Sequence, residues 1–412
     1  MEYASIEEVA KRWGISTRRI QILCADGKIE GATRFGRSWM LPKNAERPVD
    51  GRTKAGRNRT EEDMPLPRKT PFLYMTDLYT VGISPEKTAE ALSYNHEAQV
   101  LFEAEIAYSR GEIDKVYERA NYLLNKHSGF YAVLSAGMLL ALCAIWKGDL
   151  SMWRKAKVHI MQTQAKTDHD RELTVLAITA VDSMLYDVEN FPDWFKIGRF
   201  DPLPKDALPA AKVYYAKYLY ATAAAMASGN ANPVHGLQGL TLMKILPITI
   251  EPMISQARAE GMVIPEAYLR LTCAVTYHFS GNDEQAIRHI DRALEIVLPD
   301  KLYGLLAEYC RTIGDLIEYR LRAVDEGAWE EVKSLYKIYV EGWRKLNSQI
   351  TGRHIIEKLS EINRRVARLA AFKLSDKEIA VRTNLSLAGV KQAIRSISEK
   401  SGLPRSEFGA IL

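Results

Sequence analysis

The chain has 412 residues, of which 47% are hydrophobic and 26% are charged, and its net charge is +5. This length exceeds one ordinary domain, and the composition excludes a disordered or low-complexity protein because it supplies a sizeable apolar core. Four separated cysteines, with neither a Cys-x-x-Cys pair nor a close Cys/His group, predict free thiols in a reducing compartment and no zinc or other metal site.

Positive charge is concentrated at the two ends of the chain. Residues 1–70 carry 15 basic against 10 acidic side chains and residues 353–412 carry 12 against 6, whereas the middle carries 29 against 35. Basic ends on an acidic middle are typical of phosphate-binding modules attached to a body that does not bind nucleic acid. We expect four parts, with the boundaries 1–47, 48–71, 72–352 and 353–412.

Two short helices are predicted near the N-terminus. Ser5 and Glu8 form a capping box before the first helix, and Ser16 caps the second helix, which should stop near Asp26-Gly27. The exposed face of the second helix carries arginine and glutamine, which read base edges in the major groove. The candidate DNA-contacting side chains of this helix are Thr17, Arg18, Arg19 and Gln21.

A β-hairpin is predicted over residues 33–42, with Gly36 and Arg37 at its turn. Together with the run Ala10-Lys-Arg-Trp-Gly-Ile-Ser16, this stretch resembles the winged helix-turn-helix of MerR-like and excisionase-like proteins. The resemblance implies DNA contact by the second helix and by Arg37; the alternative is a structural domain with solvated arginines. Residues 48–71 lack apolar periodicity and are rich in Arg, Lys, Gly and Pro, which predicts a flexible basic linker.

The middle part is predicted to be a stack of helix pairs. Tyr277, Gly281 and Ala286 show the spacing of an aromatic residue, a turn glycine and a small residue at a helix crossing. A similar spacing recurs around Gly111, Gly148 and Gly327. This pattern resembles the tetratricopeptide repeat, which implies an α-solenoid whose concave face binds a small-molecule or protein effector.

One helix of the middle part is rich in tyrosine. The candidate effector-binding residues are Tyr214, Tyr215 and Tyr218, and the alternative is packing between repeats. Residues 129–146 form an uncharged run, and the length of this run is at the lower limit for a membrane span. We expect a buried helix instead, because no basic cluster flanks this stretch. We find no nucleophile elbow, His-Glu-x-x-His motif or phosphate-binding glycine loop, so we predict no catalytic residue, no cofactor and no enzyme.

A second two-helix unit is predicted near the C-terminus. Ser375 and Glu378 form a capping box, a turn follows at Asn384, and Ser386 caps a helix with an apolar back. The candidate DNA-contacting residues are Ser386, Lys391, Gln392 and Arg395, with Ser396 on the same predicted face.

The run Leu374-Ser-Asp-Lys-Glu-Ile-Ala380, with Leu385-Ser386, Val390-Lys391 and Glu399-Lys400-Ser401-Gly402, resembles the LuxR-type output domain. The resemblance implies a four-helix module, DNA contact through Lys391, dimerisation through the segment from Arg405 to Leu412, and contact with RNA polymerase. Three departures from the family's pattern are Lys373 in place of a glycine, Ser360-Glu-Ile-Asn363 in place of Thr-x-Arg-Glu, and Ala393 at a commonly polar, base-facing position.

We therefore predict a mainly α fold: an N-terminal winged helix-turn-helix, a central α-solenoid of tetratricopeptide-like helix pairs, and a C-terminal four-helix LuxR-type helix-turn-helix. The predicted function is that of a bacterial-type, cytoplasmic, homodimeric transcription regulator. It would bind double-stranded DNA through one or both ends under the control of an effector or partner protein, without a membrane association. The alternative is a protein-interaction scaffold whose end modules serve assembly.

Overall fold

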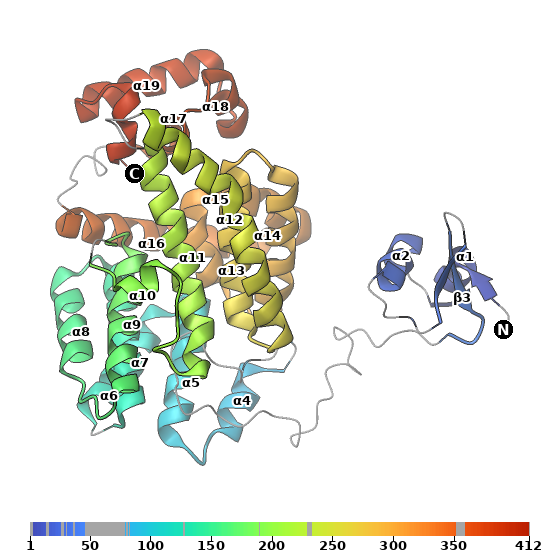
Figure 1. Ribbon diagram of the computed structural model, residues 1–412, viewed down its shortest axis with the longest axis horizontal. Helices are drawn as coiled ribbons and strands as arrows, with labels where there is room; N and C mark the ends of the chain where they lie inside the picture. Colours follow the sequence, from blue (N-terminus) through green and yellow to red (C-terminus); the bar gives the residue numbers. More distant parts are fainter. Residues whose placement is uncertain are drawn as a thin grey trace. The chain divides into compact units, whose positions relative to one another are not determined.

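The fold is mainly helical, as predicted (Figure 1). The computed structural model describes residues 3–13, 16–25, 29, 31–35, 38–45, 79, 81, 83–126, 128–188, 190–228, 233–351 and 359–411. These residues belong to two compact units, 1–64 and 65–412, which we treat separately. The predicted linker, Gly36, Arg37 and the predicted boundary near residue 353 lie outside the described residues.

The first unit combines two helices with a small antiparallel sheet. Its elements are β1 (Tyr3–Ser5), α1 (Ile6–Trp13), α2 (Thr17–Ala25), β2 (Thr33–Phe35) and β3 (Ser38–Pro42). The strand order is β1-β3-β2, with Thr33 opposite Met40, so the predicted hairpin is present. The predicted capping box is confirmed, since the Glu8 N–H donates to Ser5 Oγ at 3.3 Å. Strand β1 was not predicted, because three residues are too few to show an alternating pattern.

The second unit begins with a body of helical hairpins. The first helices of the hairpins are α5 (His96–Arg110), α7 (Phe130–Lys147), α9 (Asp168–Met184), α11 (Leu208–Ser228), α13 (Val263–Phe279) and α15 (Tyr303–Val324). Helix α9 belongs to this series but, among the described residues, has no second helix of its own. The second helices are α6 (Ile113–Asn125), α8 (Leu150–Gln162), α12 (Pro233–Ala259), α14 (Asp283–Val297) and α16 (Glu326–Thr351). The short elements are α4 (Pro85–Ala91), α10 (Asp193–Lys196) and the 3-10 helix η2 (Lys205–Ala207).

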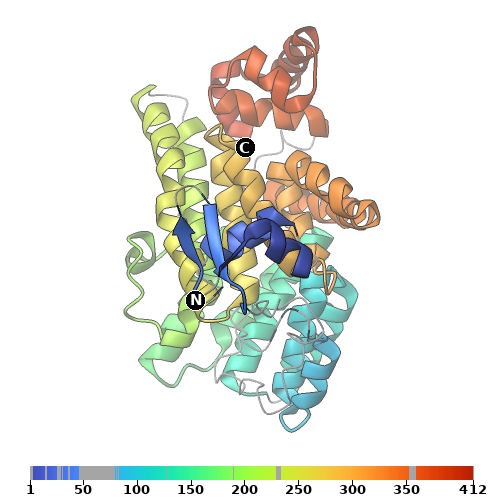
Figure 2. The ribbon, with the colours of Figure 1, turned by 90° about the vertical axis from the view of Figure 1, so that its right-hand side faces the viewer.

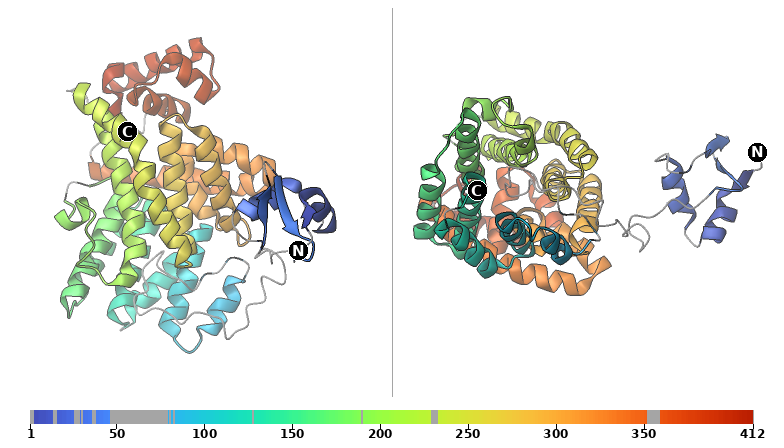
Figure 3. Two further views of the ribbon diagram at one scale, coloured as in Figure 1. Left: turned by 45° about the vertical axis from the view of Figure 1, so that its right-hand side comes forward. Right: turned by 90° about the horizontal axis from the view of Figure 1, so that it is seen from below.

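The first helices form a closed ring, seen from below in Figure 3. Each packs on the next, and α15 returns to pack on α5. At this closure a Cβ on Gly304 would lie 2.6 Å from the Tyr108 carbonyl oxygen, and where α16 crosses α7 a Cβ on Gly342 would lie 2.1 Å from the Trp146 carbonyl oxygen. Glycine therefore permits backbone contact at both crossings. The face that we expected to be an open concave surface is the interior of a ring.

Three of the four predicted turn glycines end a helix. Gly111, Gly148 and Gly281 have φ values of 83°, 61° and 88°, in the left-handed region that favours glycine. The prediction for Gly327 was wrong, because this residue lies in the first turn of α16. There the Asp325 carboxylate accepts the Ala328 N–H at 3.0 Å, so a side-chain cap starts the helix without a glycine turn.

Helix α7 is the predicted uncharged helix. Among the described residues it alone is long and apolar enough to span a membrane, but 78% of it is buried inside the body. Its Trp146 packs edge-on against Tyr108 of α5 and Tyr339 of α16. The expectation of a buried core helix is therefore confirmed.

The chain ends with α17 (Glu361–Ala371), α18 (Asp376–Thr383), α19 (Leu387–Ser401) and η4 (Arg405–Ile411), which lie at one end of the ring (Figure 2). The last element is a 3-10 helix, and its Phe408 is buried against the same chain. Lys373, directly after α17 and Phe372, adopts a left-handed conformation with a φ of 62°. Asn384 makes the turn between α18 and α19 with a φ of 54°.

Candidate functional site

Helix α19 presents a polar, basic face to solvent. It begins at Ser386, whose Oγ accepts the Gly389 N–H at 3.0 Å, and its buried side is formed by Val390, Ala393 and Ile397. The predicted DNA-contacting side chains are exposed on the other side: Lys391, Gln392 and Arg395, with Ser386 at the start of the helix. The structure thus brings the four predicted residues of this end together.

Two details of this face differ from expectation. Ala393 is 7% exposed and faces the core, so it does not occupy a base-facing position. Ser396 is turned toward α17, where its Oγ accepts a hydrogen bond from the Asn363 side-chain amide at 3.1 Å. Asn363 therefore joins α17 to α19, and Ser360 caps the start of α17 by accepting the Asn363 N–H.

Helix α2 of the first unit also has one exposed polar side. Thr17, Arg18 and Gln21 are exposed, and Ile20 and Leu23 are buried on the opposite side. The other two predicted residues of this end, the Arg19 side chain and Arg37, are outside the described part of the chain.

The predicted effector tyrosines do not share one pocket. Tyr214 is buried in the core. Tyr215 and Tyr218 stack on each other with ring centroids 6.1 Å apart, beside Phe195. Other residues of the same helix, Lys217 and Tyr220, point into the ring instead. The three predicted tyrosines therefore do not line the interior of the ring, and the residues of this helix that do lie on a different stripe of it.

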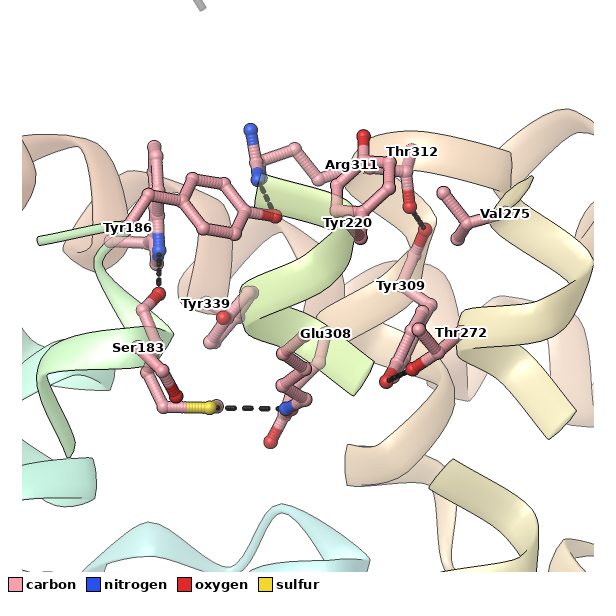
Figure 4. A pocket seen from close by; sticks show the side chains of 13 residues that line it. Ser183, Tyr186, Tyr220, Thr272, Val275, Glu308, Tyr309, Arg311, Thr312 and Tyr339 are labelled. Atoms are coloured by element: carbon pink, nitrogen blue, oxygen red, sulfur yellow. Dashed lines mark hydrogen bonds and ion pairs between the residues drawn. The ribbon is translucent and has the colours of Figure 1, made fainter. Parts of the chain in front are cut away.

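A cavity lies inside the ring (Figure 4). It is lined by residues from α9, α11, α13, α15 and α16, and its volume is about 50 Å³. The walls carry the aromatic side chains Tyr186, Tyr220, Tyr309, Tyr339 and Trp343. Since one water molecule needs roughly 10–15 Å³ of such space, the cavity admits a few water-sized groups.

One carboxylate connects the helices at the base of this cavity. Glu308 of α15 accepts hydrogen bonds from the hydroxyls of Tyr108 and Tyr268, at 2.6 and 3.0 Å, and its other oxygen lies 3.4 Å from Lys217 Nζ. The side chains of Glu308 and Lys217 are 3% and 11% exposed. Burial lowers the pKa of Lys217, and the charge of Glu308 opposes that shift.

Arg311 is a second cation of the cavity wall. Its guanidinium lies 4.1 Å from the centroid of the Trp343 ring and donates a hydrogen bond to the Tyr186 hydroxyl at 2.6 Å. No carboxylate of the described residues forms an ion pair with Arg311. The charges of Lys217 and Glu308 cancel, so Arg311 leaves the lining with one net positive charge.

The helix that carries Arg311 also holds the C-terminal helices. Arg368 of α17 donates a hydrogen bond to the Arg311 carbonyl oxygen, and Arg365 forms an ion pair with Asp315. Between these two attachments α15 is kinked at Ile313, whose φ and ψ are −127° and 28°.

A separate contact attaches the same C-terminal helices to α13. Phe372, directly after α17, stacks on Phe279 with ring centroids 4.4 Å apart. Arg382 of α18 donates to the His278 carbonyl oxygen at 2.6 Å. The cavity wall and the C-terminal helices therefore share backbone segments of α13 and α15.

Tertiary packing also corrects the expectation that the chain has no close Cys/His group. Helices α12, α13 and α14 bring Glu251, Cys273 and His289 within 4.8 Å of one another. Cys273 Sγ lies 3.7 Å from His289 Nε2, and the Tyr277 hydroxyl donates to Glu251 at 2.6 Å. Three ligand atoms are fewer than a structural zinc site uses, and Nδ1 of His289 has no hydrogen-bond partner to orient the ring.

Comparisons with protein families, curated proteins and solved structures found no match for this chain.

Proposed function

We propose that the chain is a DNA-binding transcription regulator. In this proposal α17–α19 with η4 form a LuxR-type helix-turn-helix module, and the first unit is a winged helix-turn-helix module similar to those of MerR-like and excisionase-like proteins. The body is a set of tetratricopeptide-like helix pairs that responds to an effector. The regulator acts in the cytoplasm as a homodimer, because paired modules read two half-sites.

One observation carries the proposal: the exposed, basic face of α19. Lys391, Gln392 and Arg395 lie together on the side opposite Val390 and Ile397. A helix with a buried apolar back and a front of lysine, glutamine and arginine has the donors needed for phosphates and for base edges. The capped turn before it holds this face away from the core.

The charge distribution supports the same interpretation. Residues 353–412 have twice as many basic as acidic side chains, 12 against 6. Each phosphate neutralised by such a side chain releases condensed counterions, so affinity should fall steeply as salt increases. A binding constant that hardly changes with salt would contradict phosphate contact.

The test begins with the full chain, whose binding site is found by sequencing the DNA fragments it captures. We expect Lys391→Ala to weaken binding to this site and to reduce the salt slope by about one. Lys115→Ala is a matched control, because Lys115 is an exposed lysine of α6 that pairs with Glu112, the residue before this helix. Equal affinity of the wild type and Lys391→Ala, with the fold intact, would contradict the proposal and favour a scaffold.

The two ends should also differ in their roles. Alanine at Arg18 or Gln21 should relax sequence preference, since these side chains match the donors and acceptors of base edges. Alanine at Lys391 should mainly weaken affinity, as expected for a phosphate contact. Sequencing of fragments captured by each variant distinguishes the two effects, and the reverse pattern would show that the roles are exchanged.

A further inference from the structure

We propose that the ring cavity binds a short-chain monocarboxylate, whose carboxylate pairs with Arg311, and that this ligand strengthens the attachment of the C-terminal helices to the body. The effect on DNA rests on the proposed function, whereas the binding of the carboxylate does not.

The lining carries a positive charge, that of Arg311, which no carboxylate of the described residues pairs with. Glu308 is already matched by Lys217 and by two tyrosine hydroxyls, so it leaves no negative charge for Arg311. The guanidinium of Arg311 uses one N–H for Tyr186 and places its face on Trp343. A guanidinium has five N–H donors and binds carboxylates through two parallel hydrogen bonds. A single negative charge would bring the net charge of the lining to zero.

The size of the cavity limits the rest of the ligand. Its volume of about 50 Å³ corresponds to roughly three to five water-sized groups. A carboxylate uses three non-hydrogen atoms, which leaves room for one or two more carbons. Those carbons would lie beside the aromatic side chains of the lining, such as Tyr220. Acetate and propionate fit this description, whereas an aromatic acid requires the walls to move apart.

The same arginine explains how the ligand would reach the C-terminal helices. Arg368, attached to the Arg311 carbonyl oxygen, lies near the cavity as well. The stretch of α15 from Arg311 to Asp315, which contacts Arg368 and Arg365 of α17, contains the kink at Ile313. An anion bound to Arg311 would hold this stretch of α15 in the conformation that α17 contacts, so the ligand binds more tightly when the C-terminal helices are attached.

Binding is tested on the full chain with propionate as the probe, by calorimetry and by the shift of the thermal unfolding midpoint. Acetate should also bind. Propionamide, which has the same shape without the charge, and benzoate, which is too large, should bind at least about tenfold more weakly, and so should inorganic phosphate. If propionamide bound as tightly as propionate, the charge of the ligand would not determine binding, and the pairing with Arg311 would be refuted. Equal binding of benzoate or phosphate would remove the assignment to a short carboxylate.

Variants of Arg311 locate the site. Arg311→Gln should weaken propionate binding at least about tenfold, and Arg311→Lys, which keeps the charge but not the two parallel N–H groups, should fall between it and the wild type. This ranking remains measurable if Arg311→Gln folds poorly. Arg322→Gln is the matched control on the same helix, because Arg322 pairs with Glu318 and Glu326 at the surface. Unchanged propionate affinity in Arg311→Lys would overturn the site.

Coupling is tested by amide hydrogen exchange and by DNA binding. Propionate should slow exchange in α17 and change the affinity for the captured DNA by roughly fivefold or more. Propionate binding with neither effect would overturn the coupling. If the chain bound propionate but bound no DNA under any condition, the proposed function would be refuted, whereas the carboxylate site would be supported.

Discussion

Replacing Glu308 tests whether buried polar contacts close the ring. This carboxylate of α15 meets Tyr108 of α5, Tyr268 of α13 and Lys217 of α11. Glu308→Gln keeps the shape of the side chain and an acceptor for the two hydroxyls, but removes the charge facing Lys217. The ammonium group is then left in a buried position without its counterion.

The size of the effect follows from what Lys217 can do. Removing one partner of a buried ion pair costs about 3–5 kcal/mol. Lys217 can avoid the unpaired charge by losing its proton, which at pH 7 costs at most about 4–5 kcal/mol for a group with an ordinary pKa of 10.4. Both routes give about 4 kcal/mol, a large part of the roughly 5–15 kcal/mol by which domains are stable. The double variant Glu308→Gln/Lys217→Met has neither charge and should recover most of this loss.

The assay is urea unfolding at two pH values of the wild type, Glu308→Gln, Lys217→Met and the double variant. In Glu308→Gln the pKa of Lys217 in the folded chain lies below that in the unfolded chain, so the folded state binds fewer protons. Stability should therefore rise with pH below about 10.4, and the defect should shrink between about pH 7 and pH 9. A double variant as unstable as Glu308→Gln, or a defect independent of pH, would refute this account of the Glu308 contacts.

Three other changes test separate features. Gly342→Ala should destabilise the ring by about 2 kcal/mol or more, since its Cβ would lie 2.1 Å from the Trp146 carbonyl oxygen. The control is Gly314→Ala, where the atom nearest to the new Cβ is 3.4 Å away. Equal thermal stability of the two variants would contradict the close contact at the crossing of α16 and α7. Lys373→Gly should stabilise the C-terminal helices by up to about 1 kcal/mol, because Lys373 has a φ of 62°, and a lower unfolding midpoint would argue against this. Burial raises the pKa of Tyr339 well above its ordinary value, so the stability it contributes is complete below about pH 10 and is lost as pH rises further. Tyrosinate absorbance should then report Tyr339 only as the chain unfolds, and ionisation in the folded chain, judged by comparison with Tyr339→Phe, would contradict its burial.

Local features were predictable because neighbouring residues determine them. The capping box of Ser375 and Glu378, the turn at Asn384 and the exposed side of α19 follow from side chains within a few residues of one another. The burial of α7 also followed from its own uncharged sequence. Gly327 was misplaced because a glycine in the right phase does not show whether a side-chain cap has already started the next helix.

The amino-acid sequence was enough to predict a mainly helical fold, the caps of the helices at the two ends, and the basic side chains that α2 and α19 expose. By contrast, the closure of the helices into a ring around Glu308 and Arg311 results from contacts between helices far apart in the chain. Tyr108 and Glu308 are 200 residues apart in the chain, and their hydrogen bond exists because α15 returns to α5. Periodicity shows that a helix has a buried side, but it does not show which other helix covers that side or whether a small space remains between them. The cavity depends on whether such a space remains, and this is set by the packing of the helices against one another.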